Sequence, residues 1–332
     1  MQRSKLPEEV VTEDILVVEN LKVYHAVRKL FSIIGYIRAV DDVSLKVKAG
    51  EVLAVVGESG CGKTTLARAI MKLIPITSGK IFFNGQDISR ARGKIVREWY
   101  SRQVGFVQQD PYGAMPPFMN IRTILEEPMR IHKVSPEERR KRVVEVLNEV
   151  GLTPPEDFLV KYPHMLSGGQ LQRVAIARAL VMYPKLLIAD EPVSMLDASV
   201  RIEILTLFRE LQRKYKSATI YITHDFATAK YFSDRIAVMY AGQIVEVGSS
   251  KDVINSPMHP YTKALIEVLP DPDPQNRFII KKTLPGEPPN LMNPPPGCRL
   301  SPRCPYAFNK CYKQEPPLFD TKGRLVKCWL YE

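Results

Sequence analysis

The sequence has no apolar run close to the roughly 18 residues that a helix needs to cross a lipid bilayer. Its opening stretch, MQRSKLPEEVVTEDILVVEN, lacks the basic segment followed by an apolar segment that marks a secretory signal. These absences predict a cytoplasmic chain that does not span a membrane. Basic blocks are absent too, because the Lys and Arg residues behind the net charge of +11 are scattered. Scattered charge favours a solvated basic face, so we expect no nucleic-acid partner.

Cysteine is nearly absent before residue 298, where Cys61 stands alone, and then four occur together: Cys298, Cys304, Cys311 and Cys328. None of them forms the C-x₂₋₄-C pair with which zinc sites usually begin. Disulfides are rare in the cytosol, which keeps thiols reduced. Iron–sulfur clusters take four thiolates at varied spacings, and reduced thiols also pack as small hydrophobic side chains. Spacing alone leaves all four alternatives open.

Short apolar segments indicate the fold class. Residues 51–57 (EVLAVVG), 185–190 (KLLIAD) and 218–223 (ATIYIT) are bounded by Gly, Asp or Thr and have the composition of strands buried on both faces. Helical patterns lie between them, so the sequence predicts an α/β domain with a mostly parallel sheet.

Local signals mark one helix and one irregular segment. Ser135 is placed as an N-cap, with Pro136 at the first helical position, Glu138 three residues after the cap and Gly151 beyond the end. Nine prolines between residues 270 and 296 make regular structure unlikely there, so we expect a linker or an extended strap.

Residues 57–65, GESGCGKTT, fit the phosphate-loop pattern G-x-x-x-x-G-K-[ST] and lie between a predicted strand and a predicted helix. The glycines let the backbone curl so that its N–H groups point at phosphate oxygens. Lys63 would reach the β and γ phosphates, and Thr64 would ligate Mg²⁺. The residues of this loop that we expect to bind ATP are Gly57, Glu58, Ser59, Gly60, Cys61, Gly62, Lys63, Thr64 and Thr65.

A carboxylate pair follows the apolar segment 185–190. Asp190 and Glu191 would project from the carboxyl end of a buried strand, the edge at which α/β sheets bind ligands. We expect Asp190 to hold Mg²⁺ and Glu191 to polarise the attacking water.

Residues 166–180, LSGGQLQRVAIARAL, place a serine and two glycines at a helix start, a second place that suits an anion. Because the chain already has one phosphate loop, this suggests a second nucleotide. The stretch resembles the signature motif of ABC ATPases. That resemblance implies that Ser167, Gly168, Gly169 and Gln170 close over the ATP held by a partner subunit.

Further landmarks of the ABC family match single positions. Gln109, before Asp110 and Pro111, resembles the Q-loop glutamine that contacts Mg²⁺ and senses the transmembrane partner. In SMLD, Ser194 and Asp197 match the D-loop at the dimer seam. The resemblance also makes His224 the switch histidine at the γ-phosphate and Tyr24 the aromatic that stacks on adenine.

The family implies an architecture as well. It predicts an ABC ATPase domain over residues 1–269, with an antiparallel β subdomain and an inserted helical subdomain at about 110–182. Residues 270–332 would then form the Pro-rich strap and a small C-terminal cysteine-bearing extension.

Three longer stretches narrow the resemblance to the oligopeptide/dipeptide importer subfamily, with its F-type ATPase closer than its D-type. They are residues 109–129, 259–274 and 284–307. The resemblance implies an ATPase that powers import by ATP-driven dimerisation, peripheral on the cytoplasmic face of the membrane. Its partners would be two integral permease subunits, a second and usually different ATPase, and an external substrate-binding protein.

Two other functions share part of these motifs. The same machine can import oligosaccharides, and a soluble ABC ATPase can act on ribosomes or DNA. The second fits poorly, since the chain has one phosphate loop, one signature and no heptad run. The tail resembles importer ATPase C-termini in which four cysteines ligate a [4Fe–4S] cluster, which assigns Cys298, Cys304, Cys311 and Cys328 to a structural cluster, with Zn²⁺ as the alternative.

Overall fold

The computed structural model describes residues 13–29, 32–268 and 284–332, and the chain divides into two compact units. The first unit contains the described part of Met1–Val17 together with Lys46–Val52 and Ile81–Tyr221. The second contains Val18–Leu45, Leu53–Lys80 and Ile222–Glu332. Each unit is described by itself.

Parallel strands form the centre of the first unit. β6 (Val104–Val107) and β7 (Leu186–Asp190) pair in register, and β8 (Ala218–Thr223) is the other neighbour of β7. Every residue of β7 and β8 is buried, which confirms the expectation drawn from their apolar sequences. Burial on both faces is typical of parallel strands in α/β proteins.

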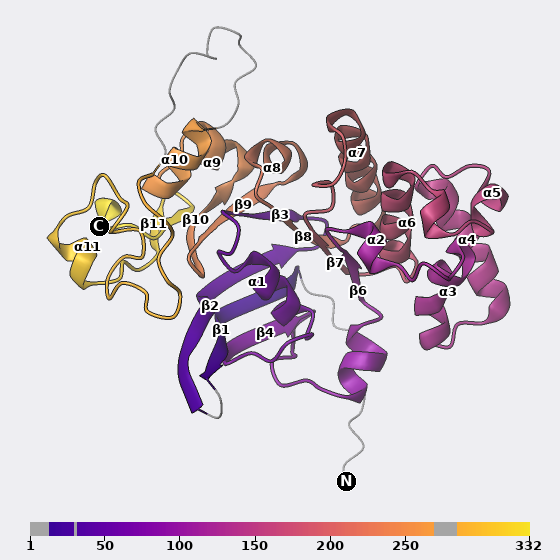
Figure 1. Cartoon of the computed structure of the whole chain (residues 1–332), viewed down its shortest axis with the longest axis horizontal. Helices are drawn as coiled ribbons and strands as arrows, with labels where there is room; N and C mark the ends of the chain where they lie inside the picture. Colours follow the sequence, from indigo (N-terminus) through magenta and orange to yellow (C-terminus); the bar gives the residue numbers. More distant parts are fainter. Residues whose placement is uncertain (1–12, 30–31, 269–283) are drawn as a thin grey trace, which may run out of the picture. The chain divides into compact units, whose positions relative to one another are not determined.

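Helices make up most of the rest of the first unit, and α3 to α6 lie side by side (Figure 1). The helices are α2 (Pro111–Ala114), α3 (Ile121–Ile131), α4 (Pro136–Glu149), α5 (Pro155–Leu159), α6 (Gly168–Leu180) and α7 (Ala198–Tyr215), with a π-helical turn at Ile95–Tyr100 and a 3₁₀ turn at Pro163–Met165.

The helix predicted after Ser135 is confirmed as α4. Ser135 and Glu138 form a reciprocal capping box, in which each side chain accepts a hydrogen bond from the other residue's backbone N–H. At the other end Gly151 has φ of 70°, and the Leu152 N–H donates to the Leu147 carbonyl at 2.9 Å. A left-handed glycine of this kind closes a helix with little strain.

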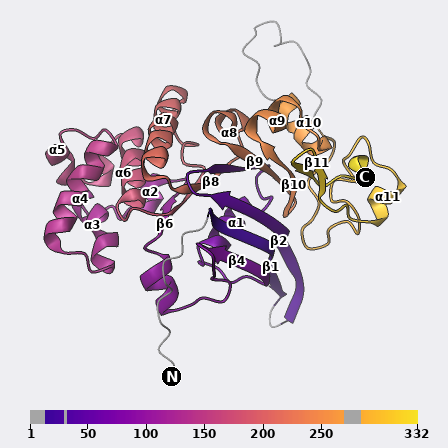
Figure 2. The same cartoon turned by 180° about the vertical axis from the view of Figure 1, so that it is seen from behind.

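In the second unit, β3 (Val52–Val56) runs parallel to β9 (Arg235–Tyr240), and β10 (Gln243–Ser249) is antiparallel to β9. The C-terminal segment then adds two short strands to the same sheet. β12 (Arg324–Val326) pairs with β10, Glu246 facing Val326, and β11 (Phe319–Thr321) pairs with β12. In Figure 2 this yellow segment runs beside the orange β10. The cysteine-bearing C-terminal segment is therefore hydrogen-bonded into the same sheet as β3, β9 and β10.

The remaining elements complete the fold. A smaller sheet has the strand order β2-β1-β4-β5, from β2 (Ser32–Lys48), β1 (Asp14–Lys29), β4 (Ser78–Phe83) and β5 (Gln86–Asp87). The helices of the second unit are α1 (Lys63–Ile70), α8 (Phe226–Phe232), α9 (Ser250–Asn255), α10 (Pro260–Glu267) and α11 (Asn309–Lys313), with a 3₁₀ turn at Trp329–Tyr331. The part of the strap at 284–297 has no helix or strand, and the rest of it lies outside the described residues. The predicted α/β class is confirmed.

Candidate functional site

The phosphate loop connects β3 to α1 in the second unit, as predicted. Two of its glycines are required by close packing. A Cβ on Gly57 would lie 2.1 Å from the carbonyl oxygen of Met239, and one on Gly62, whose φ is 110°, would lie 2.0 Å from the carbonyl oxygen of Ala39. Distances this short exclude any side chain, so the loop needs glycine at both positions.

The groups around the loop suit an anion. Helix α1 begins after Gly62 with no side chain capping its first N–H groups, which leaves the amide end of the helix for a ligand. Lys63 is only 6% exposed, and its ammonium donates to the carbonyls of Gly57 at 2.7 Å and Glu58 at 2.9 Å. Thr64 and Thr65 occupy the first turn. Cys61 is buried, and burial raises the pKa of its thiol.

The acid pair is at the carboxyl end of β7 in the first unit. Asp190 is buried, and Glu191 has φ of 46°, a conformation rare for a residue with a side chain. The amide Nε2 of Gln109 donates to Oε2 of Glu191 at 3.3 Å. The structure thus brings together two side chains separated by 82 positions that the sequence assigned to one reaction centre. The left-handed backbone of Glu191 costs roughly 1–3 kcal/mol, which the surrounding structure must offset.

The D-loop segment continues from this strand end. The hydroxyl of Ser194 donates to the carbonyl of Glu191 at 3.0 Å, so Ser194 supports the backbone of that residue. Asp197 is exposed and stands at the N-cap of α7 without a capping hydrogen bond from its side chain. The role of Asp197 at a dimer seam stays a prediction.

The signature segment forms the start of α6 in the first unit. Ser167 caps the helix and makes a reciprocal capping box with Gln170. A Cβ on Gly169 would lie 2.9 Å from Cγ1 of Val200 in α7. Packing against α7 therefore gives this glycine a structural role in addition to the anion-binding role predicted from the sequence.

Tyr24 and His224 belong to the second unit. The Tyr24 hydroxyl donates to Oδ1 of Asp41 at 2.5 Å, and burial, followed by this hydrogen bond, raises the pKa of Tyr24 to about 12. His224 is exposed directly after β8. The neighbouring Asp225 caps α8 by accepting from the N–H of Ala227. The adenine and γ-phosphate roles of Tyr24 and His224 stay predictions.

Three residues that the sequence did not single out lie next to Tyr24 or the phosphate loop: Asp41, Arg299 and Arg303. Asp41 is buried behind Tyr24, and the two arginines come from the cysteine-bearing extension. A single arginine in a chain with 47 Lys and Arg residues carries no sequence signal of its own. The sequence hints at a role for Arg299 and Arg303 only through their positions next to Cys298 and Cys304.

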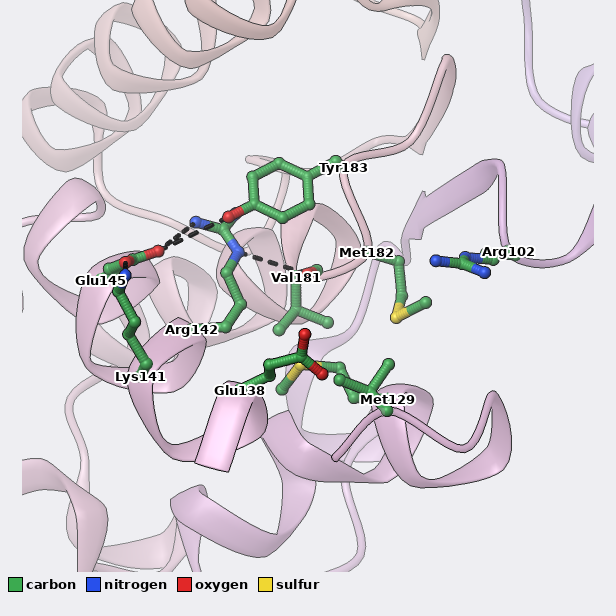
Figure 3. A pocket seen from close by; sticks show the side chains of 10 residues that line it. Arg102, Met129, Glu138, Lys141, Arg142, Glu145, Val181, Met182 and Tyr183 are labelled. Carbon is green, nitrogen blue, oxygen red and sulfur yellow. Dashed lines mark hydrogen bonds and ion pairs between the residues drawn. The ribbon is translucent and has the colours of Figure 1, made fainter. Parts of the chain in front are cut away.

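A cavity of about 320 Å³ lies in the first unit around Arg142, but none of the predicted site residues lines it (Figure 3). Arg142 is 5% exposed and donates to the carbonyls of Leu180 at 3.1 Å and Val181 at 3.2 Å. Its guanidinium also lies 3.9 Å from the ring centroid of Tyr183. We therefore interpret this arginine as a cap on the carboxyl end of α6.

The predicted [4Fe–4S] cluster is wrong, and zinc gains no support either. Among the residues that the structure describes, no group of three or more His, Cys, Asp or Glu side chains is arranged to hold a metal ion. The four cysteines do line one cavity, but its volume is about 10 Å³. That is the space of about one water molecule, far less than four irons and four sulfides need.

All five cysteines are free thiols. Burial raises the pKa of Cys298 to about 11 and also raises the pKa values of Cys304 and Cys328. The thiolate is the form that ligates metals, so this environment favours the opposite, neutral form. The thiols pack as small hydrophobic side chains, one of the four alternatives that their spacing leaves open.

The helices described by the structure include none long and apolar enough to cross a membrane. The ABC transporter family model matches residues 40–194, and the model for the oligopeptide/dipeptide transporter C-terminal region matches residues 245–311. The second match includes part of the tail from which the subfamily was predicted.

Curated relatives and solved structures agree with these models. The di/tripeptide transport ATP-binding protein DppF of Pseudomonas aeruginosa is 41% identical, over 95% of this chain and 97% of the relative. The oligopeptide transport ATP-binding protein OppF of Salmonella typhimurium is 43% identical, over 88% and 87%. A dimeric post-hydrolysis structure of the ATP-binding cassette MJ0796, bound to ADP and phosphate, superposes with a TM-score of 0.63 at 29% identity, covering 71% of this chain and 98% of that one. The resemblance predicted from the sequence is confirmed, and the chain belongs to the ATP-binding proteins of ABC transporters.

Proposed function

We propose that this chain is the ATP-hydrolysing subunit of an ABC importer for oligopeptides or dipeptides. The observation that carries the proposal is the combination, in one chain, of the ATPase motifs with a C-terminal region of the oligopeptide/dipeptide transporter type. Relatives named for peptide transport cover nearly the whole chain, which favours peptides over oligosaccharides. None of the matches described above is a protein that acts on ribosomes or DNA.

ATP binding is assigned to the phosphate loop. Its N–H groups and the open end of α1 would hold the phosphates, with the Lys63 ammonium beside them. Tyr24 would stack on the adenine. Mg²⁺, when bound, neutralises phosphate charge, and the oxygen ligands of Thr64, Gln109 and Asp190 fit its preference for hard donors.

Hydrolysis is assigned to Glu191 as the base that orients and polarises water. The hydrogen bond from Gln109 holds the carboxylate of Glu191 in one orientation, and Ser194 supports its backbone. His224 would contact the γ-phosphate. Ser167, Gly168, Gly169 and Gln170 would close over the ATP of a partner ATPase, with Ser194 and Asp197 at the seam.

The assembly follows from this division of the site. Each ATPase subunit would supply one phosphate loop and one signature, so two subunits would enclose two nucleotides. We place the chain peripherally at the cytoplasmic face of the membrane, with two permease subunits, a second ATPase that is a different chain, and an external binding protein that delivers the cargo.

A Glu191→Gln substitution tests the hydrolytic assignment. The variant should bind ATP like the original chain, because the amide keeps the shape of the side chain, while turnover falls roughly 100-fold or more through loss of the base. ATP-dependent dimers should accumulate and can be followed by light scattering. Unchanged turnover would overthrow Glu191 as the base.

Transport itself tests the cargo. The complete transporter, reconstituted in vesicles with its binding protein outside, should accumulate labelled di- to pentapeptides when ATP is inside. Matched oligosaccharides should not accumulate. Uptake of sugars in preference to peptides would contradict the proposal while leaving the ATPase assignment in place.

A further inference from the structure

Arg303, in the C-terminal extension, contacts the phosphate loop. It is 8% exposed, and its Nη1 lies 3.5 Å from Oε2 of Glu58 and 3.4 Å from the Tyr240 hydroxyl. Its Nε donates to the carbonyl of Pro285 at 3.0 Å, which ties the same guanidinium to the strap. One side chain therefore joins the strap, β9 and the second residue of the loop.

Glu58 is fixed from another direction as well. Its N–H donates to the hydroxyl of Tyr261 at 3.0 Å, and Tyr261 is fully buried. The rings of Tyr261 and Tyr240 have centroids 4.5 Å apart. Arg303 and Tyr261 together hold the carboxylate and the backbone of one loop residue, so the loop is anchored before its glycine turn begins.

Arg299, four residues earlier, reaches the other end of the predicted nucleotide site. It is 4% exposed and donates to Oδ2 of Asp41 and to the carbonyl of Ala241. Asp41 accepts the Tyr24 hydroxyl on its other oxygen. Although burial alone would raise the pKa of Asp41, Tyr24 and Arg299 outweigh it and hold that pKa below its usual value. Asp41 is therefore a charged link between Arg299 and the aromatic ring assigned to adenine.

The turn beside Arg299 connects this link to the loop. The N–H of Gly242 donates to the carbonyl of Cys61 at 2.8 Å, and the carbonyl of Gly242 accepts from the N–H of Asp41 at 2.8 Å. A Cβ on Gly242 would lie 3.1 Å from Nη1 of Arg299. Both of these bonds join backbone groups, so the turn holds the loop through main-chain hydrogen bonds that do not involve the guanidinium.

We propose that Arg299 and Arg303 are positioning residues for ATP: Arg299 orients Tyr24 through Asp41, and Arg303 fixes the phosphate loop through Glu58. The C-terminal extension thereby sets the affinity of the site for nucleotide. This rests on the proposed roles of Tyr24 and the phosphate loop. Neither arginine touches a reacting group, so the rate of hydrolysis at saturating ATP should depend little on them.

The test uses Arg299→Gln and Arg303→Gln in the full chain, with ATP and inorganic tripolyphosphate as probes. Arg303→Gln should weaken both ligands about tenfold, because the phosphate loop is common to both. Arg299→Gln should weaken ATP about tenfold and tripolyphosphate by less than about twofold, because only ATP uses the ring of Tyr24. In both variants KM for ATP should rise while kcat stays within about twofold, the pattern of lost uniform binding.

Lys327→Gln is the matched control. Lys327 is 7% exposed, belongs to the same extension and pairs with Glu315 at 2.6 Å, without contacting the loop or Asp41. It should lower the melting temperature but leave KM for ATP unchanged. If it raises KM as much as Arg303→Gln does, the arginines only stabilise the extension, and the proposal is overturned.

Coupling between Arg299 and Tyr24 gives a second readout. Tyr24→Phe removes the hydroxyl and keeps the ring, so Arg299→Gln should weaken ATP binding much less in that background than alone. If the effects of Arg299→Gln and Tyr24→Phe on the free energy of ATP binding are fully additive, the proposed path from Arg299 through Asp41 to Tyr24 is overturned. Arg299→Lys and Arg303→Lys keep a charge and should recover part of the affinity even if the glutamine variants fold poorly.

If the proposed ATP site itself is wrong, the experiments will give a different result. In that case the original chain would not bind ATP, or Lys63→Ala would bind it equally well, and both conclusions would fall. ATP binding that depends on Lys63 but is identical in the two glutamine variants overturns the positioning role alone.

Discussion

The phosphate loop and the cysteine-bearing tail both gather reactive residue types in the second unit, but they use them in opposite ways. The loop curls its polar groups toward one point: Lys63 lies inside the curl, and α1 begins without a side-chain cap. The tail turns its thiols toward a space of about 10 Å³, and burial raises the pKa values of Cys298, Cys304 and Cys328, which favours their neutral form. Residue type alone does not make a site, because the geometry decides whether polar groups converge on a ligand or pack against one another.

Lys63→Ala should produce the largest difference between the two regions. Removing the ammonium takes away charge-assisted hydrogen bonds to phosphate, so ATP affinity should fall roughly 100-fold, since each such bond is worth about 1.5–3 kcal/mol. Calorimetric titration with ATP measures the loss. Lys230→Ala, an exposed lysine of α8, serves as the control and should bind normally. Normal ATP binding by Lys63→Ala would remove the loop from the nucleotide site.

Two glycines of the loop separate packing from backbone strain. Gly57→Ala brings a methyl group to 2.1 Å from the Met239 carbonyl and should cost about 3 kcal/mol in unfolding free energy. The added methyl group of Gly60→Ala meets no atom within 4 Å. This substitution should lower the free energy of unfolding by only about 1 kcal/mol, because a φ of 77° is unfavourable for alanine. Urea denaturation compares them directly. Equal losses would mean that the loop is held less tightly against Met239 than these contacts indicate.

The tail should respond to pH in a way that a metal site would not. The folded pKa of Cys298, about 11, is raised above its ordinary value of 9.0, so the folded state retains the proton longer than the unfolded chain. Its contribution is fully present below pH 9 and is lost as pH rises toward 11, by about 2 kcal/mol. Stability profiles from pH 7 to 11 should therefore be flatter in Cys298→Ala. A metal-bound thiolate would instead lose stability at low pH, and such a profile would contradict the packed-thiol interpretation.

Adding or removing metal ions should change the melting temperature least of all these experiments. A ligand present at 100 times its dissociation constant stabilises a folded protein by about 2.7 kcal/mol, so a real zinc or iron site would raise the melting temperature clearly. We expect no change on adding zinc, or iron with sulfide, and none on adding a chelator. Protein purified without oxygen should also show no stoichiometric iron or acid-labile sulfide. A reproducible rise in melting temperature with either metal would restore the site.

Contiguous signals were sufficient to predict much of the fold. The capping residues around Ser135, the loop at 57–65 and the buried strands each depend on neighbouring residues, whose spacing is visible in the sequence. The sequence did not predict the hydrogen bond between Gln109 and Glu191 itself. The family resemblance predicted only that both residues belong to one reaction centre. Local chemistry therefore predicted the elements, and the resemblance predicted which of them act together.

Long-range contacts could not be predicted in the same way. Arg299 reaches Asp41 across 258 positions and Arg303 reaches Glu58 across 245, and no periodicity connects such pairs. The four cysteines illustrate the same limit, because spacings of several residues do not determine how close the side chains come. Their burial depends on how the tail packs in the fold, which the residue pattern does not contain.

The pairing of β12 with β10 has a consequence for the synthesis of the protein. Until residues 324–326 leave the ribosome, β10 has no partner on that side, and its backbone groups could pair with another nascent chain. Once β12 is in place, the sheet ends in β11, a strand of only three residues that offers little to a passing chain. The strand pair β11 and β12 thus covers the edge that β10 would otherwise present, and a chain truncated before residue 324 should aggregate more readily because that edge is open.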